Sequence, residues 1–219
     1  MSREFSEEDR LLLQEIMRLR RDVRGNKFID KPISDNTVRQ ILQVAEISPS
    51  VGFSQPWEFV VIRSPETKQA VADVFAQENT RAKPLFDLDK QEQYGQLKLE
   101  GIVKTPVNVA VFYKPSDKAV LGQTSMDEMG KYSVVCAIQN MWLMARAMNI
   151  GIGWVSILDP QKVKNILAVP AEFKLVAYLC VGYVSEFLDS PELEQIKWEA
   201  RYPIDEVIHE EYYSNKTPL

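Results

Sequence analysis

The chain has 219 residues, of which 45% are hydrophobic and 26% charged, with a formal net charge of −5. This composition is typical of a globular domain and excludes low-complexity and collagen-like classes. The net acidity argues against nucleic acid or an anionic membrane as the main partner. Only two cysteines occur, Cys136 and Cys180, each within an apolar run. We therefore expect buried free thiols, no disulfide framework and a reducing, cytoplasmic location.

The segment Met1–Arg10 is charged and lacks the apolar stretch of a signal peptide. The longest apolar candidate, 134–148, is interrupted by Gln139, Asn140 and Arg146. It therefore falls short of the ~18 consecutive apolar residues of a membrane span, and we expect no membrane association.

Capping residues and apolar spacing predict alternating helices and strands. Helices are expected from Ser6 to Arg20, after Ser34, from Pro65, over 132–148 and over 160–167; strands are expected over 59–62, 107–113, 152–157 and 175–184. This order predicts an α+β fold with a mixed β-sheet flanked by helices, forming a single domain over 1–219.

Two segments stand apart from this core. Residues 77–100 form the most polar stretch, and they predict an exposed helical insertion. It is either a lid over a site or a solvated excursion of the surface. The tail 190–219 carries apolar side chains without a clear period. Wrapping around a second subunit is one way to bury them.

The segment Arg20-Arg21-Asp22-Val23-Arg24 places three arginines within five residues. The planar guanidinium suits bidentate binding of phosphate. A solvated basic turn at a helix end is the alternative, because cations are also favoured at the C-terminus of a helix.

A second segment, Pro49-Ser50-Val51-Gly52-Phe53-Ser54-Gln55-Pro56-Trp57, is stiffened by two prolines. Gly52 permits unusual backbone angles, and the aromatic side chains offer flat apolar surface. The segment is either a structural turn or a loop that lies against a planar ring.

Taken together, the two segments resemble the nitroreductase family of FMN proteins. In that family an Arg-Arg-Ser-x-Arg-like segment follows the first helix, and a Pro-Ser-x-x-Asn-x-Gln-Pro-Trp segment follows the second. Arg201-Tyr202-Pro203 is similar to a C-terminal element that holds the same phosphate. The resemblance implies a domain-swapped homodimer with FMN at the interface and the arm 190–219 extending over the partner subunit.

Two departures from the general family pattern are informative. Asp22 replaces a serine that helps to bind phosphate, and Phe53 replaces an asparagine. A carboxylate beside an anion is unfavourable, so Asp22 is either chemically active or part of a structural ion pair with a neighbouring arginine. Both departures, with Lys98–Ile102, Tyr132–Asn140 and Gly151–Ile157, resemble a branch of the family that makes 5,6-dimethylbenzimidazole, the lower ligand of cobalamin.

In that branch, reduced FMN is a substrate: O2 and reduced FMN give 5,6-dimethylbenzimidazole and erythrose 4-phosphate, and a separate flavin reductase supplies the reduced FMN. The resemblance implies Asp22 as the acid/base and Ser156 as a hydrogen-bonding partner of the flavin ring. Arg20 and Arg201 would hold the phosphate, and Arg24 would lie near the pyrimidine edge.

The remaining roles that the resemblance implies concern contacts around the flavin. Arg21 and Val23 would contribute backbone contacts, and Leu99 would line the pocket. From the partner subunit, Pro49, Ser50, Val51 and Gly52 would contact the flavin while Phe53 excludes water.

Two other functions compete with this one. The first is an FMN-retaining NAD(P)H-dependent reductase of nitroaromatics or quinones, and the second is a flavin-binding module without turnover. A metal site is not expected, because His209 is the only histidine. A dinucleotide-binding loop is not expected either, because Gly151-x-Gly153 lacks the third glycine.

Overall fold

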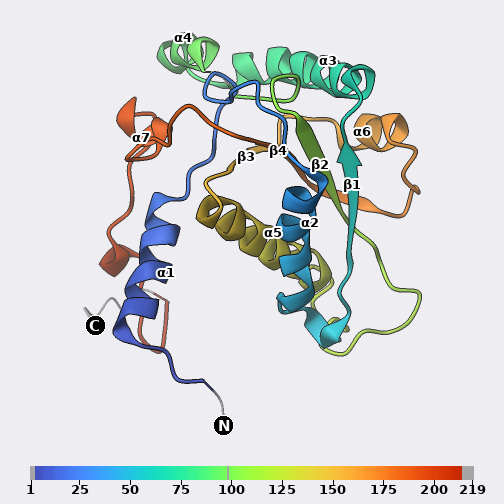
Figure 1. Ribbon diagram of the computed structural model, residues 1–219, viewed down its shortest axis with the longest axis vertical. Coiled ribbons are helices and arrows are strands. Elements are labelled where there is room, and N and C mark those ends of the chain that lie inside the picture. Colours follow the sequence, from blue (N-terminus) through green and yellow to red (C-terminus); the bar gives the residue numbers. More distant parts are fainter. Residues whose placement is uncertain (1–2, 98, 214–219) are drawn as a thin grey trace. The chain divides into compact units, whose positions relative to one another are not determined.

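A four-stranded sheet organises the chain in the computed structural model, which describes residues 3–97 and 99–213 (Figure 1). The strands lie in the order β1-β2-β4-β3. Their bounds are β1 Trp57–Ile62, β2 Val107–Tyr113, β3 Gly151–Val155 and β4 Lys174–Gly182. Central register pairs are Val60 with Ala110, Ala110 with Tyr178, and Trp154 with Leu179.

The prediction of a mixed sheet is wrong for the four strands described, because all three strand pairs are antiparallel. A single parallel bridge joins Asp22 to Ile152 at the β3 edge. The direction of a strand depends on where each connection re-enters the sheet, and the pattern of apolar residues does not specify that.

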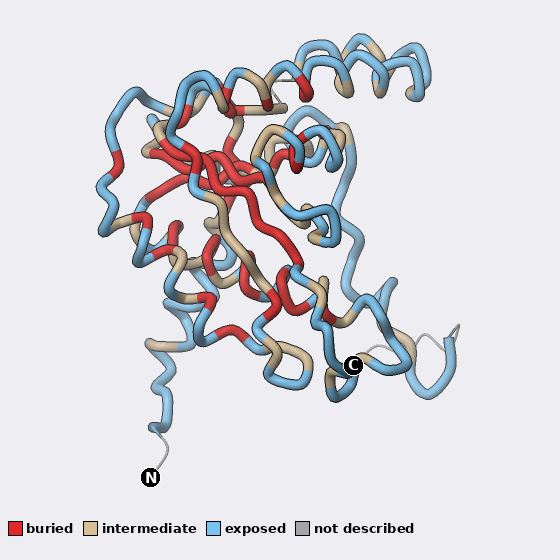
Figure 2. The backbone as a smooth tube through the Cα atoms, turned by 90° about the vertical axis from the view of Figure 1, so that its right-hand side faces the viewer, coloured by how far each residue is buried: buried red, intermediate tan, exposed pale blue. Residues whose placement is uncertain are grey.

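Helices cover both faces of the sheet. One apolar cluster of the sheet packs against α2 (Asp35–Gln43), the short η1 (Val44–Ile47) and α5 (Met129–Ala147). The second apolar cluster, on the opposite face, packs against α3 (Pro65–Ala82) and α6 (Pro160–Ile166). Because successive side chains of a strand point to opposite faces, Val109 and Val111 join the first cluster while Ala110 and Phe112 join the second. β2 is buried along its whole length, and β4 is buried over its last six residues (Figure 2).

Local capping confirms three predicted helix starts. The Ser6 side chain accepts a hydrogen bond from the Asp9 backbone and starts α1 (Glu7–Leu19). Ser34 caps α2 in the same way, and Asp159 with Pro160 starts α6. α1 has no buried residue, and Leu12 and Met17 are exposed. Its stability therefore does not come from burying an apolar face within this chain.

Most of residues 77–96, within the polar stretch 77–100, is helical, as predicted. It comprises the end of α3, the short η3 (Lys83–Leu85) and α4 (Leu88–Gln96). Tyr94 holds α4 against α3, since its hydroxyl donates to Asn79 at 2.7 Å and its ring lies 4.9 Å from that of Phe86. Lys98 lies outside the described residues. The movement of this segment as a lid stays a prediction.

The chain divides into two compact units, Met1–Phe187 and Leu188–Leu219. The second unit contains α7 (Glu192–Gln195) and η4 (Ile204–Glu206), and it corresponds to the predicted arm. Within it Tyr202 and Ile204 are exposed. The assignment of 1–219 to one domain stays a prediction.

The two cysteines differ. Cys180 is buried in β4 as expected, whereas Cys136 is exposed, which corrects the expectation of two buried thiols. Cys136 lies in the apolar part of α5, but its position turns it away from the buried face that includes Val134 and Ala137. No helix in the described parts of the chain is both long and apolar enough to cross a membrane.

Close backbone packing at the β3 edge depends on glycine. A Cβ atom on Gly153 would lie 2.3 Å from the Val23 carbonyl oxygen, and one on Gly25 would lie 2.1 Å from the Glu100 carbonyl oxygen. Both distances are well inside van der Waals contact, so the backbone after α1 reaches β3 only because Gly153 lacks a side chain, and it reaches the turn at Glu100 only because Gly25 lacks one.

We predict that Gly153→Ala lowers the free energy of unfolding by about 1–3 kcal/mol, because the clash is with backbone that cannot rotate away. Urea unfolding measures this change. Gly95→Ala is the matched control, since its nearest neighbour is the flexible end of Lys83 at 3.4 Å; it should be neutral or stabilising by up to ~1 kcal/mol. Equal effects of the two substitutions would contradict this interpretation.

Candidate functional site

The segment Arg20–Arg24 leaves the end of α1 and lies along the outer edge of β3. The Val23 backbone N–H donates to the Ile152 carbonyl at 3.0 Å. From the other side, the Trp142 indole N–H of α5 donates to the Arg21 carbonyl at 3.2 Å. The backbone of this segment is thus fixed by both the sheet and a helix.

Asp22 is held by two donors. Its Oδ1 accepts a hydrogen bond from the Trp154 backbone N–H at 2.8 Å, and its Oδ2 lies 3.0 Å from Nη1 of Arg24. The carboxylate is 29% exposed and the Arg24 side chain 14% exposed. Because an ionised carboxylate is the form that accepts at both oxygens, this arrangement favours negatively charged Asp22.

The two arginines before Asp22 have different surroundings. The Arg20 guanidinium lies 4.7 Å from the centre of the Trp142 ring, and its Nε is buried without a hydrogen-bond partner among the described residues. Arg21 is 8% exposed, and its Nη1 donates to the carbonyls of Arg18 and Arg20. Arg21 therefore stabilises its own turn.

The buried unsatisfied donor of Arg20 fits an anionic ligand. A buried polar group without a partner is costly, and bound phosphate would satisfy it. Arg24 and the turn stabilised by Arg21 complete a basic segment around this donor. These residues therefore fit the phosphate of FMN.

Leu99 directly precedes the turn that contacts Gly25, and its predicted role in lining the flavin pocket stays a prediction. It is partly buried and packs against the cluster on the α3 side of the sheet. The next residue, Glu100, has its carbonyl oxygen against Gly25. Its carboxylate accepts from the Ile102 backbone N–H at 2.5 Å.

A buried polar network that sequence reasoning missed supports this turn. Asn108, fully buried in β2, donates to the Ile102 carbonyl at 2.9 Å and lies 3.0 Å from the Tyr178 hydroxyl. The Thr105 hydroxyl lies 2.6 Å from the Asn108 side-chain oxygen. Burial raises the pKa of the neighbouring Cys180 thiol and of the Tyr178 hydroxyl, so both stay protonated. A single asparagine in an apolar strand was the available signal.

Ser156 follows the last residue of β3 and is exposed. It lies two residues after Trp154, whose N–H holds Asp22. Asp22, through its hydrogen bond to Trp154, and Ser156 therefore both lie near the end of β3.

The loop Pro49–Phe53 lies elsewhere in the chain. It contains η2 (Val51–Phe53), and the Val51 N–H donates to the Ser133 hydroxyl near the start of α5. Trp142, which contacts Arg20, lies nine residues further along α5, which at 1.5 Å per residue is ~13 Å. Ser48, directly before the loop, accepts a hydrogen bond from the Asn140 side chain at 2.8 Å, so the loop begins near the middle of α5 and its Val51 end lies toward the start of the helix, away from Trp142.

The loop is conformationally strained. Gly52 and Phe53 both have φ of +54°, a region that a residue with a side chain rarely adopts. A Cβ on Gly52 would lie 2.7 Å from the Leu121 carbonyl. The Ser50 hydroxyl accepts from the Gln55 N–H at 3.1 Å, Pro49 is exposed, and the Phe53 side chain is 77% exposed.

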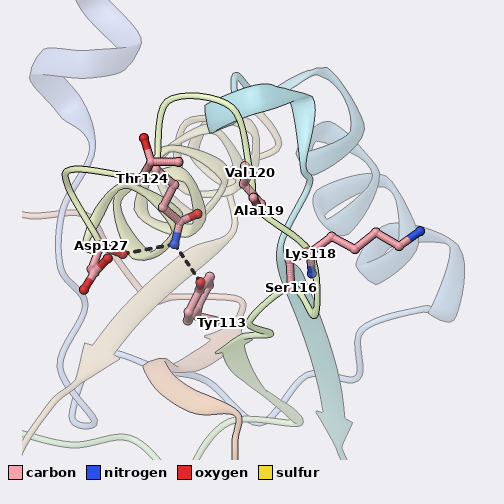
Figure 3. A pocket seen from close by; sticks show the side chains of 8 residues that line it. Tyr113, Ser116, Lys118, Ala119, Val120, Thr124 and Asp127 are labelled. Carbon is pink, nitrogen blue, oxygen red and sulfur yellow. Dashed lines mark hydrogen bonds between the residues drawn. The ribbon is translucent and has the colours of Figure 1, made fainter.

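A surface pocket of about 310 Å³ lies next to this loop (Figure 3). It is lined by the connection between β2 and α5, and its Val120 contacts the position of Gly52. The Gln123 side chain donates to the Tyr113 hydroxyl and the Asp127 carbonyl at its rim. The residues that the sequence predicted for the flavin site are not among those that line it.

Arg201 belongs to the second unit. Its Nε lies 3.3 Å from a carboxylate oxygen of Glu194, and the side chain is 71% exposed. Its contribution to phosphate binding stays a prediction. Within the described ranges, three or more His, Cys, Asp or Glu side chains do not gather into a group that could hold a metal ion.

Comparison with known proteins identifies the class. Residues 17–183 match the model of the nitroreductase family, so the chain belongs to the nitroreductase family.

Within that family, the chain is 44% identical over 196 residues to the 5,6-dimethylbenzimidazole synthase of Rhodospirillum rubrum, covering 87% of this chain and 90% of that protein. It is 36% identical to a protein of the same name from Rhodobacter capsulatus, covering 92% and 97%.

The fold agrees with solved structures. An iodotyrosine deiodinase bound to FMN and 3-iodo-L-tyrosine superposes with a TM-score of 0.70 at 20% sequence identity, covering 91% of this chain and 98% of that one. This likeness confirms the α+β nitroreductase-like fold predicted from the sequence.

The ion pair between Asp22 and Arg24 leads to a stability prediction. Combining Asp22→Asn with Arg24→Gln in a double-mutant cycle should give a coupling free energy of about 1–2 kcal/mol, because both groups are partly buried. Urea unfolding of the four proteins measures it. The exposed pair Arg63 with Asp35 is the control, expected to give less than ~0.5 kcal/mol. A coupling near zero at Asp22 would show that the ion pair does not stabilise the fold.

Proposed function

We propose that this protein is a 5,6-dimethylbenzimidazole synthase, which fragments reduced FMN in the presence of O2 to 5,6-dimethylbenzimidazole and erythrose 4-phosphate. The observation that carries the proposal is Asp22: a carboxylate fixed by Trp154 and Arg24 within the arginine segment. A negative charge at this position does not favour the binding of phosphate itself, so we assign the carboxylate a chemical role in addition to its ion pair with Arg24. The 44% identity to the synthase of Rhodospirillum rubrum supports the same assignment.

The arginine segment would bind the flavin through its phosphate. Arg20 offers a buried donor without a hydrogen-bond partner among the described residues, and Arg201 would add a second guanidinium. Leu99 would line the pocket from the turn that packs on Gly25. When bound, reduced FMN and O2 would supply the redox chemistry of ring opening.

Asp22 would move a proton during the cleavage. Its two hydrogen-bonded oxygens favour the ionised form, so it starts as a proton acceptor at Oδ2 or Oδ1. The Trp154 N–H keeps the carboxylate oriented while the proton is taken up. The Ser156 hydroxyl, at the same end of β3, would donate a hydrogen bond to the flavin ring.

A homodimer would complete the site. Val51 in the strained loop contacts Ser133, nine residues before Trp142 in α5, and Phe53 exposes its ring. In a dimer the loop of one subunit would cover the flavin of the other. Exposed apolar residues of the unit Met1–Phe187 offer the necessary interface. They include Leu11, Leu12, Met17, Ile47 and Val135. A separate flavin reductase would provide reduced FMN.

The test uses reduced FMN mixed with the full-length protein without oxygen and then exposed to air. We expect a product with the mass of 5,6-dimethylbenzimidazole, identified by liquid chromatography and mass spectrometry. A flavin reductase of the same family would instead oxidise NAD(P)H rapidly and retain its FMN. Recovery of intact FMN as the only flavin product would overturn the proposal.

The role of Asp22 has its own test. In the same assay, Asp22→Asn should lower the rate of dimethylbenzimidazole formation by about 10²–10⁴-fold, the range expected for loss of an acid/base group. The matched control is Asp35→Asn, which removes an exposed carboxylate at the start of α2 and should keep the wild-type rate. A normal rate in Asp22→Asn protein would exclude Asp22 from proton transfer.

A further inference from the structure

Two side chains of α5 fix the backbone on both sides of Arg20. Trp142 donates from its indole N–H to the Arg21 carbonyl at 3.2 Å, and Arg146 donates from Nε to the Leu19 carbonyl at 3.1 Å. They are four residues apart and therefore lie on the same face of the helix. The residue that they bracket is the one whose Nε is buried without a partner.

Trp142 also contacts the Arg20 side chain directly. The guanidinium carbon lies 4.7 Å from the centre of the indole ring, within the range of a cation–π interaction. Such an interaction holds the planar guanidinium over the ring. The hydrogen-bonding N–H groups of a guanidinium stacked in this way lie in its plane, beside the ring rather than against it.

The same indole is joined to the support of Asp22. The ring centres of Trp142 and Trp154 lie 6.1 Å apart at 45°, a favourable geometry for two aromatic rings. Trp154 in turn donates its backbone N–H to Asp22. Trp142, 8% exposed, is therefore packed between the residue that would bind phosphate and the residue that fixes the carboxylate.

We propose that Trp142 is a positioning residue that acts through Arg20 and sets the preference of the site for a flavin that carries a phosphate. The inference rests on the proposed binding of FMN by Arg20. Trp142 fixes the backbone after Arg20 with its N–H and orients the guanidinium with its ring. Arg146 contributes a smaller part through the Leu19 carbonyl.

The test compares the dissociation constants of oxidised FMN and riboflavin, which differ only in the phosphate, by calorimetry. Wild-type protein should bind FMN at least ~10-fold more tightly, because a charge-assisted hydrogen bond to phosphate is lost with riboflavin. Trp142→Phe keeps an aromatic ring but lacks the N–H, and it should weaken FMN binding ~3–10-fold with riboflavin binding unchanged. Trp142→Leu should lower the preference for FMN over riboflavin further than Trp142→Phe does.

Two comparisons separate positioning from a structural role. Ile138→Val is a buried change on the same helix that should keep the preference for FMN. In an Arg20→Gln background, Trp142→Phe should cause no further loss of preference, because its effect passes through Arg20. If Trp142→Leu does not fold, Trp142→Phe and Arg146→Gln still carry the test, and circular dichroism checks each variant.

Three results would overturn the inference. Trp142→Phe could weaken the binding of FMN and riboflavin equally, or it could leave the preference for FMN unchanged. The losses of preference caused by Trp142→Phe and Arg20→Gln could also add up in the double variant. The measurement uses oxidised flavin, so it is independent of product formation. If the wild-type protein forms no dimethylbenzimidazole but the flavin-binding results are as predicted, only the proposed function is contradicted.

Discussion

The docking of the backbone after α1 onto the edge of β3 is the contact on which the candidate site depends. Two hydrogen bonds make it, one between Val23 and Ile152 and one between Trp154 and the Asp22 side chain. Gly153 leaves room for the approach. Because β3 is paired to β4, whose last six residues are buried, the carboxylate is attached to the sheet. This attachment gives Asp22 a fixed position beside Arg20 and Arg24.

Local sequence signals predicted much of the fold. Ser6, Ser34 and Asp159 start helices where they were expected, because a cap needs only the next three backbone N–H groups. Strand direction was not predictable in this way, and the expected mixed sheet is antiparallel in its described strands. The exposure of Cys136 was missed for a related reason: its neighbours are apolar, but the helix turns that one position outward.

The sequence singled out the residues of the candidate site, and their roles stay predictions. Asp22 stood out because a carboxylate is out of place among phosphate-binding arginines, and an ion pair with a neighbouring arginine was one of the two roles considered; the structure shows that pair with Arg24. Trp142 and Asn108 carried only the signal of polar atoms inside apolar segments. Trp142 donates to Arg21, 121 residues away, and Asn108 donates to Tyr178, 70 residues away, and no local pattern encodes these two contacts. Ser50 and Phe53 lie apart from Arg20 in one chain, so their predicted roles depend on a second subunit.

A crystal structure of the protein with FMN bound tests the central claim most directly, because the claim concerns where a fixed carboxylate lies relative to the ligand. The account predicts the phosphate on the Arg20 guanidinium, with Asp22 still hydrogen-bonded to the Trp154 N–H and its carboxylate facing the flavin. Phosphate bound away from Arg20, or Asp22 directed away from the flavin, would contradict it.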